Sequence, residues 1–340
     1  MNKILVTGGA GFIGVNSALY FYKKGWRVSV LDNLSRRGAE SNLKWLNEQA
    51  GVEFHRVDVR NKQDIERLIK ETQPDAILHL AGQVAVTTSV QNPAEDFDVN
   101  AVGTFNLLEA LRNFSKDTFF INASTNKVYG SMEGVGVIER NGRYEYENLI
   151  EGIDENQVLD FHSPYGCSKG AADQYTIDYA RIYGIRSTSF RQSCIYGPRQ
   201  FGIEDQGWVA WFVIASCLGK PISIYGDGKQ TRDILHVNDL ISAYYAAIDN
   251  QEAASGQSFN IGGGPRNIIS LLELVDFLRQ IVGKRIAVSF EQWRPGDQRV
   301  FVSNVSKAER VLSWSPTITS SQGIGQLVEW VNMNKELFCL

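Results

Sequence analysis

A glycine-rich segment near the start of the chain constrains the fold more than any other feature of the sequence. Residues 7–14 read T-G-G-A-G-F-I-G, between an apolar run at 3–7 and an amphipathic stretch at 12–24. Two overlapping patterns, G-x-G-x-x-G and G-x-x-G-x-x-G, are formed by Gly8, Gly9, Gly11 and Gly14. Glycines at this spacing, after a strand and before a helix, let backbone N–H groups approach the diphosphate of a dinucleotide. The segment predicts a dinucleotide site, and the alternative is a glycine-rich turn that binds nothing.

The first half of the chain alternates short apolar runs with longer amphipathic stretches. The expected strands are Lys3–Thr7, Arg27–Leu31, Glu53–Val57, Ala76–Leu80 and Thr118–Ala123. Helical patterns lie between them at 12–24, 61–72 and 99–113. Nearly all-apolar strands are typical of a sheet that is buried on both faces. The alternation predicts βαβ units, and right-handed crossovers then give an α/β fold with a doubly wound parallel sheet.

The second half of the chain predicts fewer and more separated strands, and we expect a smaller mixed α/β domain that binds substrate. Its expected elements are helices at 165–183, 208–218, 237–248 and 270–282, with strands at 186–193 and 258–261. The predicted division is a Rossmann domain at 1–195 plus 236–265, a substrate domain at 196–235 plus 266–315, and a C-terminal helix at 316–340. The polar stretch 132–161 is expected to be an insertion over the site, because long ordered loops are often functional.

Composition excludes several classes of protein. The chain has 340 residues, with 34 Lys and Arg against 38 Asp and Glu, so its net charge of −4 gives no footprint for nucleic acid. No two of its four cysteines form a C-x-x-C pair, and its four histidines show no H-E-x-x-H spacing, so no metal site is expected. No apolar run approaches the roughly 18 residues that span a membrane. The first apolar run is too short for a signal peptide, so we expect a cytoplasmic protein.

Asp32, at the end of the second strand, bears on the choice of dinucleotide. A carboxylate there accepts hydrogen bonds from the adenosine ribose and repels a 2′-phosphate, which favours NAD over NADP. Arg36 and Arg37 keep NADP open, since an arginine can pair with that phosphate. Asp58, next to Val59, comes after the third strand and is a candidate to hold the adenine. The alternative for Asp58 is the N-cap of the next helix.

Tyr165 and Lys169 form a Y-x-x-x-K pair, which lies on one face of a helix. An ammonium beside a phenol favours the phenolate, so we expect the pKa of Tyr165 to lie below its ordinary value of about 10. Such a tyrosine can exchange a proton with a sugar hydroxyl. Ser124, at the end of the fifth strand, is the third candidate, and the alternative is a hydroxyl that only satisfies the backbone.

Together these motifs resemble the extended short-chain dehydrogenase/reductase family. The resemblance rests on T-G-G-A-G-F-I-G at 7–14, H-L-A-G at 79–82, Asn100, S-T-N-K-V-Y-G at 124–130, Y-G-C-S-K at 165–169, Y-G-P-R at 196–199, R-D-I-L-H-V-N-D at 232–239 and R-P-G-D at 294–297. It spans nearly the whole chain. It implies a Rossmann domain of six or seven strands, tightly held NAD and a nucleotide-sugar substrate.

The resemblance also implies roles for individual residues. Tyr165 would be the general base, with Lys169 as its electrostatic partner and ligand of the nicotinamide ribose. Ser124 and Thr125 would bind the sugar hydroxyls. The remaining expected cofactor residues are Gly8, Gly11, Phe12, Ile13, Gly14, Asp32, Asn33, Arg36, Asp58, Val59, Leu80, Ala81, Gln83 and Asn100.

The expected substrate residues lie mostly in the second half of the chain. Arg232 and Arg294 would hold the diphosphate, and arginine suits phosphate oxygens. The alternative is a surface ion pair, such as Arg294 with Asp297. The other expected substrate residues are Asn126, Gln200, Gln206, Tyr225 and Asp297.

The two residues after Thr125 narrow the choice of reaction. A dehydratase of this family carries an Asp-Glu pair there, to supply acid and base for elimination, but this chain has Asn126 and Lys127. The departure favours an epimerase. A sugar carbinol C–H is not acidic enough for direct deprotonation. Oxidation to a ketone removes the stereocentre, and hydride return to the other face inverts it.

The stretch 82–93, the pair Asn126-Lys127 and the insertion 132–161 resemble the family branch that acts at C2 of a CDP-linked 3,6-dideoxyhexose. That resemblance implies conversion of CDP-paratose to CDP-tyvelose for lipopolysaccharide O-antigen synthesis. A UDP-sugar 4-epimerase stays open, as does a non-catalytic NAD-binding regulator on the same fold. The helices at 99–113 and 165–183 are expected to form the interface of a homodimer or homotetramer; alternatively, they only pack on the sheet.

Overall fold

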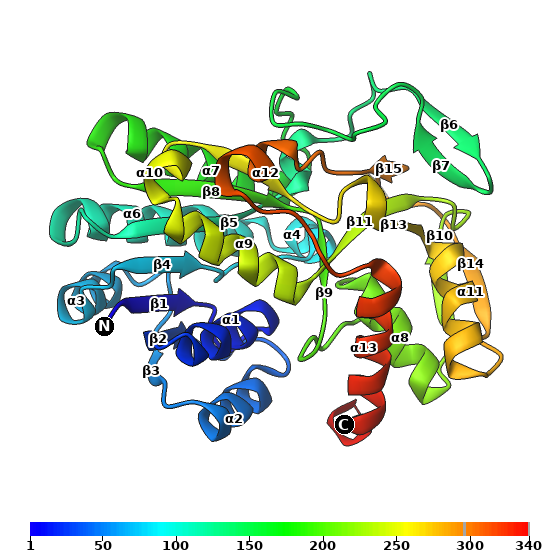
Figure 1. The fold of residues 1–340 in the computed structure, drawn as a ribbon, viewed down its shortest axis with the longest axis horizontal. Coiled ribbons are helices and arrows are strands. Elements are labelled where there is room, and N and C mark those ends of the chain that lie inside the picture. The colour runs from blue at the N-terminus through cyan, green and yellow to red at the C-terminus, as the bar shows by residue number, and fades with distance from the viewer. Residues whose placement is uncertain (295–296, 339–340) are drawn as a thin grey trace.

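A seven-stranded parallel sheet forms the centre of the larger lobe (Figure 1). The structure is a computed structural model, and it describes residues 1–294 and 297–338. The strand order is β12-β8-β5-β4-β1-β2-β3. The bounds are β1 (Lys3–Thr7), β2 (Arg27–Asp32), β3 (Glu53–Arg56), β4 (Ala76–His79), β5 (Phe119–Thr125), β8 (Ser187–Gln192) and β12 (Ser258–Ile261). The predicted doubly wound α/β fold is confirmed.

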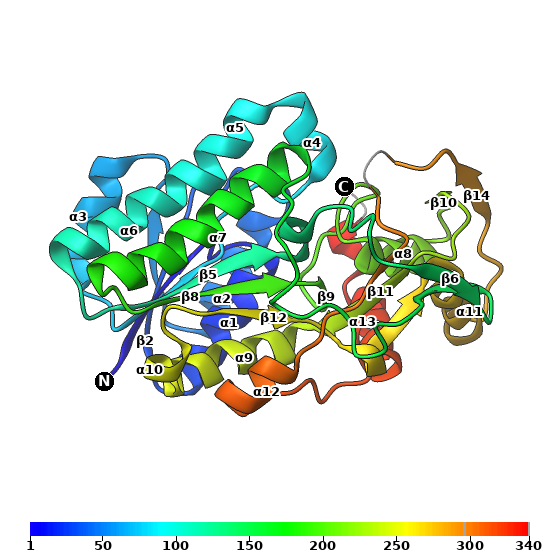
Figure 2. The same ribbon diagram turned by 90° about the horizontal axis from the view of Figure 1, so that it is seen from above.

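Helices cover both faces of the sheet (Figure 2). On one face lie α1 (Phe12–Lys23), α2 (Ala39–Gln49) and α9 (Val237–Asp249), and on the other lie α3 (Lys62–Thr72), α6 (Gly103–Phe114) and α7 (Ser163–Tyr183). Alternate residues of β1 serve the two cores: Ile4 and Val6 pack in one cluster, and Leu5 packs in the other. This two-sided burial explains why the strands are apolar throughout.

The smaller lobe has its own hydrophobic core, built around α8 (Trp208–Leu218), α11 (Leu271–Val282) and α13 (Ser320–Met333). Its strands are β9 (Cys194–Tyr196), β10 (Ile222–Tyr225), β11 (Thr231–His236), β13 (Ile268–Ser270), β14 (Val288–Glu291) and β15 (Val300–Phe301). The arrowheads of the large sheet point toward this lobe, so the carboxyl ends of its strands face it (Figure 1). Ligands of open α/β sheets bind at that edge.

Three segments pack differently from the predicted division. The helix α12 (Ser306–Leu312) buries Ala308 and Leu312 in the core of the large lobe, although the sequence predicts it in the substrate domain. The helix α13 belongs to the small lobe rather than standing apart, and the last two residues of the predicted segment 316–340 lie outside the described residues. The hairpin of β6 (Val137–Arg140) and β7 (Arg143–Tyr146), within the expected first domain, packs against β11 and β15. A local pattern indicates that a face is apolar, but not which lobe covers it.

A helix that the sequence analysis did not predict is α2. Its sequence is mostly polar, and its buried residues are only Ala39, Asn42 and Leu46. The short helices α4 (Val86–Gln91) and α5 (Pro93–Phe97) were also not predicted, whereas the predicted helix at 99–113 is present as a π-helical turn at Asp98–Val102 followed by α6. Each has few apolar residues on a helical spacing, so tertiary contacts decide its conformation.

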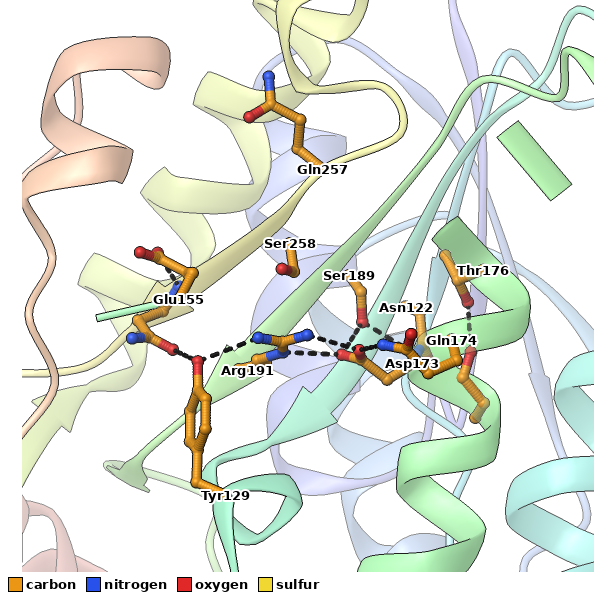
Figure 3. Close-up of polar contacts among 12 residues, drawn as sticks. Asn122, Tyr129, Glu155, Asp173, Gln174, Thr176, Ser189, Arg191, Gln257 and Ser258 are labelled. Carbon is orange, nitrogen blue, oxygen red and sulfur yellow. Dashed lines mark hydrogen bonds and ion pairs between the residues drawn. The ribbon is translucent and has the colours of Figure 1, made fainter. Parts of the chain in front are cut away.

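A buried ion pair joins α7 to the sheet (Figure 3). Arg191 on β8 donates from Nε to Oδ1 of Asp173 at 3.2 Å and from Nη2 to Oδ2 at 3.0 Å. The two side chains are 5% and 0% exposed. Ser189 adds a hydrogen bond to Asp173 Oδ1 at 2.7 Å. Two-pronged pairing and additional hydrogen bonds are what a buried pair needs to offset its loss of hydration.

The same arginine connects the insertion to the sheet (Figure 3). Its Nη1 donates to the Tyr129 hydroxyl at 3.1 Å, and that hydroxyl donates to Asn260 Oδ1 at 2.7 Å. Asn260 donates from its backbone to Glu155 at 2.7 Å and from its amide to the Ile153 carbonyl at 2.8 Å. Burial raises the pKa of Glu155. The network therefore links β8, α7, β12 and the insertion.

We predict that Asp173→Asn lowers the free energy of unfolding by about 3–5 kcal/mol, because it leaves the Arg191 charge buried without its partner. Urea unfolding measures this as a lower midpoint. Asp178→Asn is the matched control, since Asp178 is on the same helix and pairs with Arg181 at the surface. The control should stay within about 0.5 kcal/mol of the parent. Equal effects of the two variants would contradict a dominant role for the buried pair.

Candidate active site

The glycine turn between β1 and α1 leaves no room for a side chain at Gly8, Gly9 or Gly14. A Cβ added to Gly14 would lie 2.2 Å from the Gly8 carbonyl oxygen, and a Cβ added to Gly8 would lie 2.7 Å from the Ala81 nitrogen. Gly8 also has a φ of +65°, in the left-handed region that glycine adopts readily. Gly11 is the N-cap of α1 and offers no side-chain cap to the first N–H groups of that helix. These groups are available to an anion.

The Asp32 carboxylate lies beside this turn. Its Oδ2 accepts from the Ala10 N–H at 3.0 Å, and its Oδ1 accepts from the Leu34 N–H at 2.8 Å. Burial raises the pKa of Asp32, and these two hydrogen bonds act in the opposite direction. The side chain of Arg36 donates to Gln206, so the loop after β2 reaches a loop of the small lobe.

Asp58 is held by two neighbours rather than capping a helix. It accepts from Arg60 Nη2 at 2.7 Å and from Asn33 Nδ2 at 2.8 Å. The hydrogen bonds from Arg60 are the main cause that lowers the pKa of Asp58 to about 2. The N-cap alternative is wrong, because Asn61 caps α3. The side chain of the adjacent Val59 is buried in the core, so any contact of Val59 with an adenine must be through its backbone.

Buried hydrogen bonds hold the end of β4 against β1. Thr7 Oγ1 contacts His79 Nδ1 at 2.7 Å and accepts from the Ala81 N–H at 3.2 Å, next to Leu80. His79 Nε2 lies 3.0 Å from Thr104 Oγ1. Burial lowers the pKa of His79 to about 3, so the ring is neutral and serves structure.

The loop after β4 is fixed by reciprocal hydrogen bonds with Asn100. The Gln83 N–H donates to Asn100 Oδ1, and Asn100 Nδ2 donates to the Gln83 carbonyl, both at 3.0 Å. Asn100 Nδ2 also lies 3.1 Å from Ser168 Oγ on α7. The expected cofactor residues Gln83 and Asn100 are thus joined to the helix that carries Tyr165 and Lys169.

Ser124, Tyr165 and Lys169 are all buried where β5 ends and α7 begins. The Ser124 hydroxyl has no hydrogen-bond partner within residues 1–294 and 297–338, which contradicts the alternative that it satisfies the backbone. Lys169 is one helical turn after Tyr165. The chain that the structure describes likewise gives Lys169 no hydrogen bond. Unpaired buried polar groups cost free energy, and they persist at sites that bind another molecule.

The prediction that the pKa of Tyr165 lies below its ordinary value is wrong when only the groups of the protein are considered. Burial raises the pKa of Tyr165 to about 12, while Thr125 and Arg36 act in the opposite direction. Burial lowers the pKa of Lys169 to about 8, and Asp173 and Asp96 counteract this shift. The cost of removing water from the phenolate therefore outweighs the hydrogen bond with Thr125 and the attraction of Arg36.

Asp96 is a site residue that sequence reasoning missed. It lies on α5, is 0% exposed, and accepts hydrogen bonds from Ser168 and Asn100. Its pKa is raised by burial. The local sequence around Asp96 resembles an ordinary acidic first helical turn, so only the tertiary structure shows its charge beside Lys169.

The predicted diphosphate residues have other partners than expected. Arg232 Nη2 donates to Asp297 Oδ1 at 2.8 Å, and Arg232 is 7% exposed. Arg294 instead pairs with Asp205 at 2.8 Å and lies over the Tyr225 ring, 3.9 Å from its centroid. The alternative of a surface ion pair is thus present for Arg294, but its partner is Asp205 and not Asp297.

The remaining expected substrate residues lie at the ends of strands or in loops. Thr125 and Asn126 come directly after Ser124, and both are buried. Gln200 donates to the Ile195 carbonyl at 3.3 Å, and its buried Oε1 has no partner in the described part of the chain. The Tyr225 hydroxyl donates to Glu204 at 3.1 Å. Lys127, which sequence analysis noted but did not assign to the site, reaches Gln298 at 3.3 Å.

The residues fit NAD on three observations. The glycine turn presents the first N–H groups of α1, the Asp32 carboxylate lies beside it, and the buried Ser124 hydroxyl has no partner among the described residues. Among the described residues, no helix is long and apolar enough to cross a membrane, and no cluster of potential metal ligands is present.

The chain matches the family model described as GDP-mannose 4,6 dehydratase over residues 5–327. It belongs to this family of NAD-dependent epimerases and dehydratases. The predicted short-chain dehydrogenase/reductase membership is thereby confirmed, as is the prediction of an NAD-dependent enzyme of the isomerase class.

Proteins of similar length resemble this chain over nearly its whole sequence. CDP-paratose 2-epimerase of Salmonella typhi is 46% identical over 335 residues, which cover 97% of this chain and 99% of the relative. The structure is similar to that of UDP-glucose 4-epimerase of Thermotoga maritima with UDP-glucose, at 30% identity and a TM-score of 0.83, covering 98% of this chain and 99% of that chain. It is also similar to UDP-glucose 4-epimerase of Thermus thermophilus in complex with NAD, at 31% identity and a TM-score of 0.80, covering 96% and 98%.

We predict that Gly14→Ala removes most of the NAD from the purified family member, because the new Cβ would overlap the Gly8 carbonyl. A displacement that costs roughly 1.4 kcal/mol or more weakens binding tenfold or more. The nucleotide released on denaturation, per mole of protein after gel filtration, measures this. Gly325→Ala is the control, since its Cβ would have nothing within 4 Å. Full NAD content in the Gly14 variant would argue against a dinucleotide at this turn.

Proposed function

We propose that this enzyme interconverts CDP-paratose and CDP-tyvelose by inverting C2 of the sugar, a step in the synthesis of O-antigen dideoxyhexoses. The observation that carries the proposal is the 46% identity to a CDP-paratose 2-epimerase over nearly the full length of both chains. The site residues Ser124, Tyr165 and Lys169 support oxidation and reduction of a carbinol. Their joint presence also argues against a non-catalytic regulator, which needs no buried acid–base tyrosine.

Dehydration is disfavoured by the residues after β5. Elimination of water needs a base for the carbon acid and an acid for the leaving hydroxyl. Asn126 is an amide, and Lys127 is an ammonium that hydrogen-bonds Gln298. The nearby carboxylate Asp297 is paired with Arg232. This arrangement offers no free carboxylate for the elimination.

The residues of the site have distinct roles in the proposed epimerisation. NAD, held at the glycine turn and Asp32, would supply the hydride-accepting and hydride-donating chemistry. Tyr165 takes the proton from the sugar hydroxyl as the carbinol becomes a ketone, and gives it back on reduction. The buried hydroxyl of Ser124, with Thr125, holds the reacting oxygen. Lys169 would supply positive charge to the site, and Asp173 and Asp96 favour the protonated form of Lys169.

A UDP-sugar 4-epimerase is the second candidate, and the likeness to the UDP-glucose 4-epimerase structures favours it. The same residues can act at C4 if the sugar is turned in the site. The two candidates differ in the base and in the carbon presented to Tyr165.

We further propose that the protein forms a homodimer or homotetramer through α6 and α7. One face of each helix packs on the sheet, but Phe105 is 39% exposed, Tyr175 is 50% exposed and Ile182 is 61% exposed. A stripe of exposed apolar side chains on adjacent helices is typical of an interface. Sedimentation should give at least twice the mass of one 38.0 kDa chain, and a monomer would contradict this.

We predict that the purified protein converts CDP-paratose in D₂O without added cofactor and keeps hydrogen at C2. Hydride transfer within the enzyme retains that hydrogen, whereas deprotonation would introduce deuterium. Proton NMR of the sugar detects both. No change with CDP-paratose but inversion of a UDP-hexose at C4 would favour the second candidate. In the same assay, Tyr165→Phe should lower turnover roughly 10²–10⁴-fold, while Tyr22→Phe, at an exposed tyrosine of α1, should not.

We predict that Asp96→Asn moves the pH–rate profile to lower pH. The Asp96 charge raises the pKa of both Tyr165 and Lys169. Removal of this charge lowers both pKa values. Each limb of the pH–rate profile that depends on Tyr165 or Lys169 should therefore move to lower pH by roughly half a unit to one unit. Turnover measured across pH tests this. Glu95→Gln removes an exposed neighbouring carboxylate and should leave the limbs in place, and an upward movement for Asp96→Asn would contradict the assignment.

A further inference from the structure

Two cationic side chains meet at one residue between the lobes. Lys127 Nζ donates to the side-chain Oε1 of Gln298 at 3.3 Å, and Arg232 Nη2 donates to the backbone carbonyl of the same residue. The side-chain amide of Gln298 in turn donates to the Gly130 carbonyl. Gln298 therefore holds the end of the β5 turn and strand β11 together, with the two cations side by side.

The charges at this point do not balance. Asp297 pairs with Arg232. The neighbouring Cys194 thiol is neutral, because burial raises its pKa. Within the described residues, the only hydrogen bond of the Lys127 ammonium is to a neutral amide, although an ammonium has three donors. Burial and the Arg232 charge lower the pKa of Lys127, and the single carboxylate Asp297 only partly counteracts them. An anion that binds here would relieve this repulsion.

The backbone of Lys127 lies close to the acid–base residues. It lies three positions after Ser124, and a Cβ on Gly166 would lie 3.4 Å from the Lys127 carbonyl oxygen. Its backbone is therefore against the first turn of α7, which carries Tyr165, and its side chain reaches Gln298, the residue that Arg232 also binds. If a substrate binds with its diphosphate at Arg232 and its reacting carbon at Tyr165, Lys127 lies between these two ends.

We propose that Lys127 binds the sugar-side phosphate of the substrate and thereby places C2, rather than C4, at Tyr165. In a pyranose ring, C2 is bonded to C1, which carries the phosphate, whereas C4 is across the ring from C1. Inversion at C2 therefore requires the phosphate to lie close to the acid–base residues. Lys127 meets this requirement, because its backbone lies against the first turn of α7 and its ammonium lies at Gln298, beside Arg232. The inference rests on the proposed function for the identity of the reacting carbon.

The test compares nucleotides with and without the outer phosphate. CMP and CDP, and in parallel UMP and UDP, are titrated calorimetrically into the holoenzyme and its variants. Lys127→Met should weaken the diphosphate of the preferred base by about ten- to a hundredfold, the effect of losing a hydrogen bond to a charged group. The monophosphate should be affected by less than about twofold, and Lys127→Arg should retain most of the affinity for the diphosphate. Lys116→Met, at the opposite end of β5 and exposed, is the matched control.

The outcomes separate the parts of the proposal. Equal weakening of the monophosphate and the diphosphate would overturn binding of the sugar-side phosphate by Lys127. With CDP-paratose as substrate, the Lys127→Met variant should lose C2 turnover or release some of the C4 epimer, as seen by NMR. Unchanged kcat at C2 with weakened CDP would overturn the placement of the sugar. If the parent protein does not turn over CDP-paratose, the proposed function fails, and the nucleotide titrations still decide on the phosphate.

Discussion

The buried pair of Arg191 and Asp173 determines where the catalytic helix lies. The helix α7 carries Tyr165 and Lys169 on its first two turns and Asp173 one turn later. Because Arg191 belongs to β8, which pairs with β5, the pair positions those turns against the end of β5, where Ser124 is buried. Through Tyr129 and Asn260, the same arginine reaches the insertion. One polar network thus connects the sheet, the catalytic helix and the segment over the site.

Burial sets the electrostatics of this site more than any single charge. It moves the pKa of Tyr165 up to about 12 and that of Lys169 down to about 8, so each group moves toward its neutral form. Asp96 and Asp173 partly restore the charge of Lys169. A site with these properties favours proton transfer only when a substrate and cofactor complete its charge balance. The pair of Lys127 and Arg232 shows the same principle on the substrate side, where excess positive charge suits a diphosphate.

Sequence patterns were most informative where one physical requirement acts along a short stretch. The apolar strands, the glycine turn and the helix at 208–218 follow from burial and steric limits within a few residues. The missed helix α2 has a weak apolar face, and its conformation depends on packing against α1. Asp96 and the partners of Arg232 and Arg294 were not predicted, because each depends on residues that are distant in sequence.

By itself, the sequence determined that the chain forms a parallel α/β sheet with a dinucleotide turn, because strand burial and glycine sterics are local properties. It also placed Ser124, Tyr165 and Lys169 at the ends of elements whose carboxyl or amino termini meet. Only the tertiary structure decided which charges surround these groups and how far water is excluded from them. The pKa of Tyr165, the pairing of Arg232 with Asp297 and the position of Lys127 beside Arg232 all depend on contacts between separate segments. Electrostatic energies depend on distance and burial, and neither is defined until the lobes are folded together.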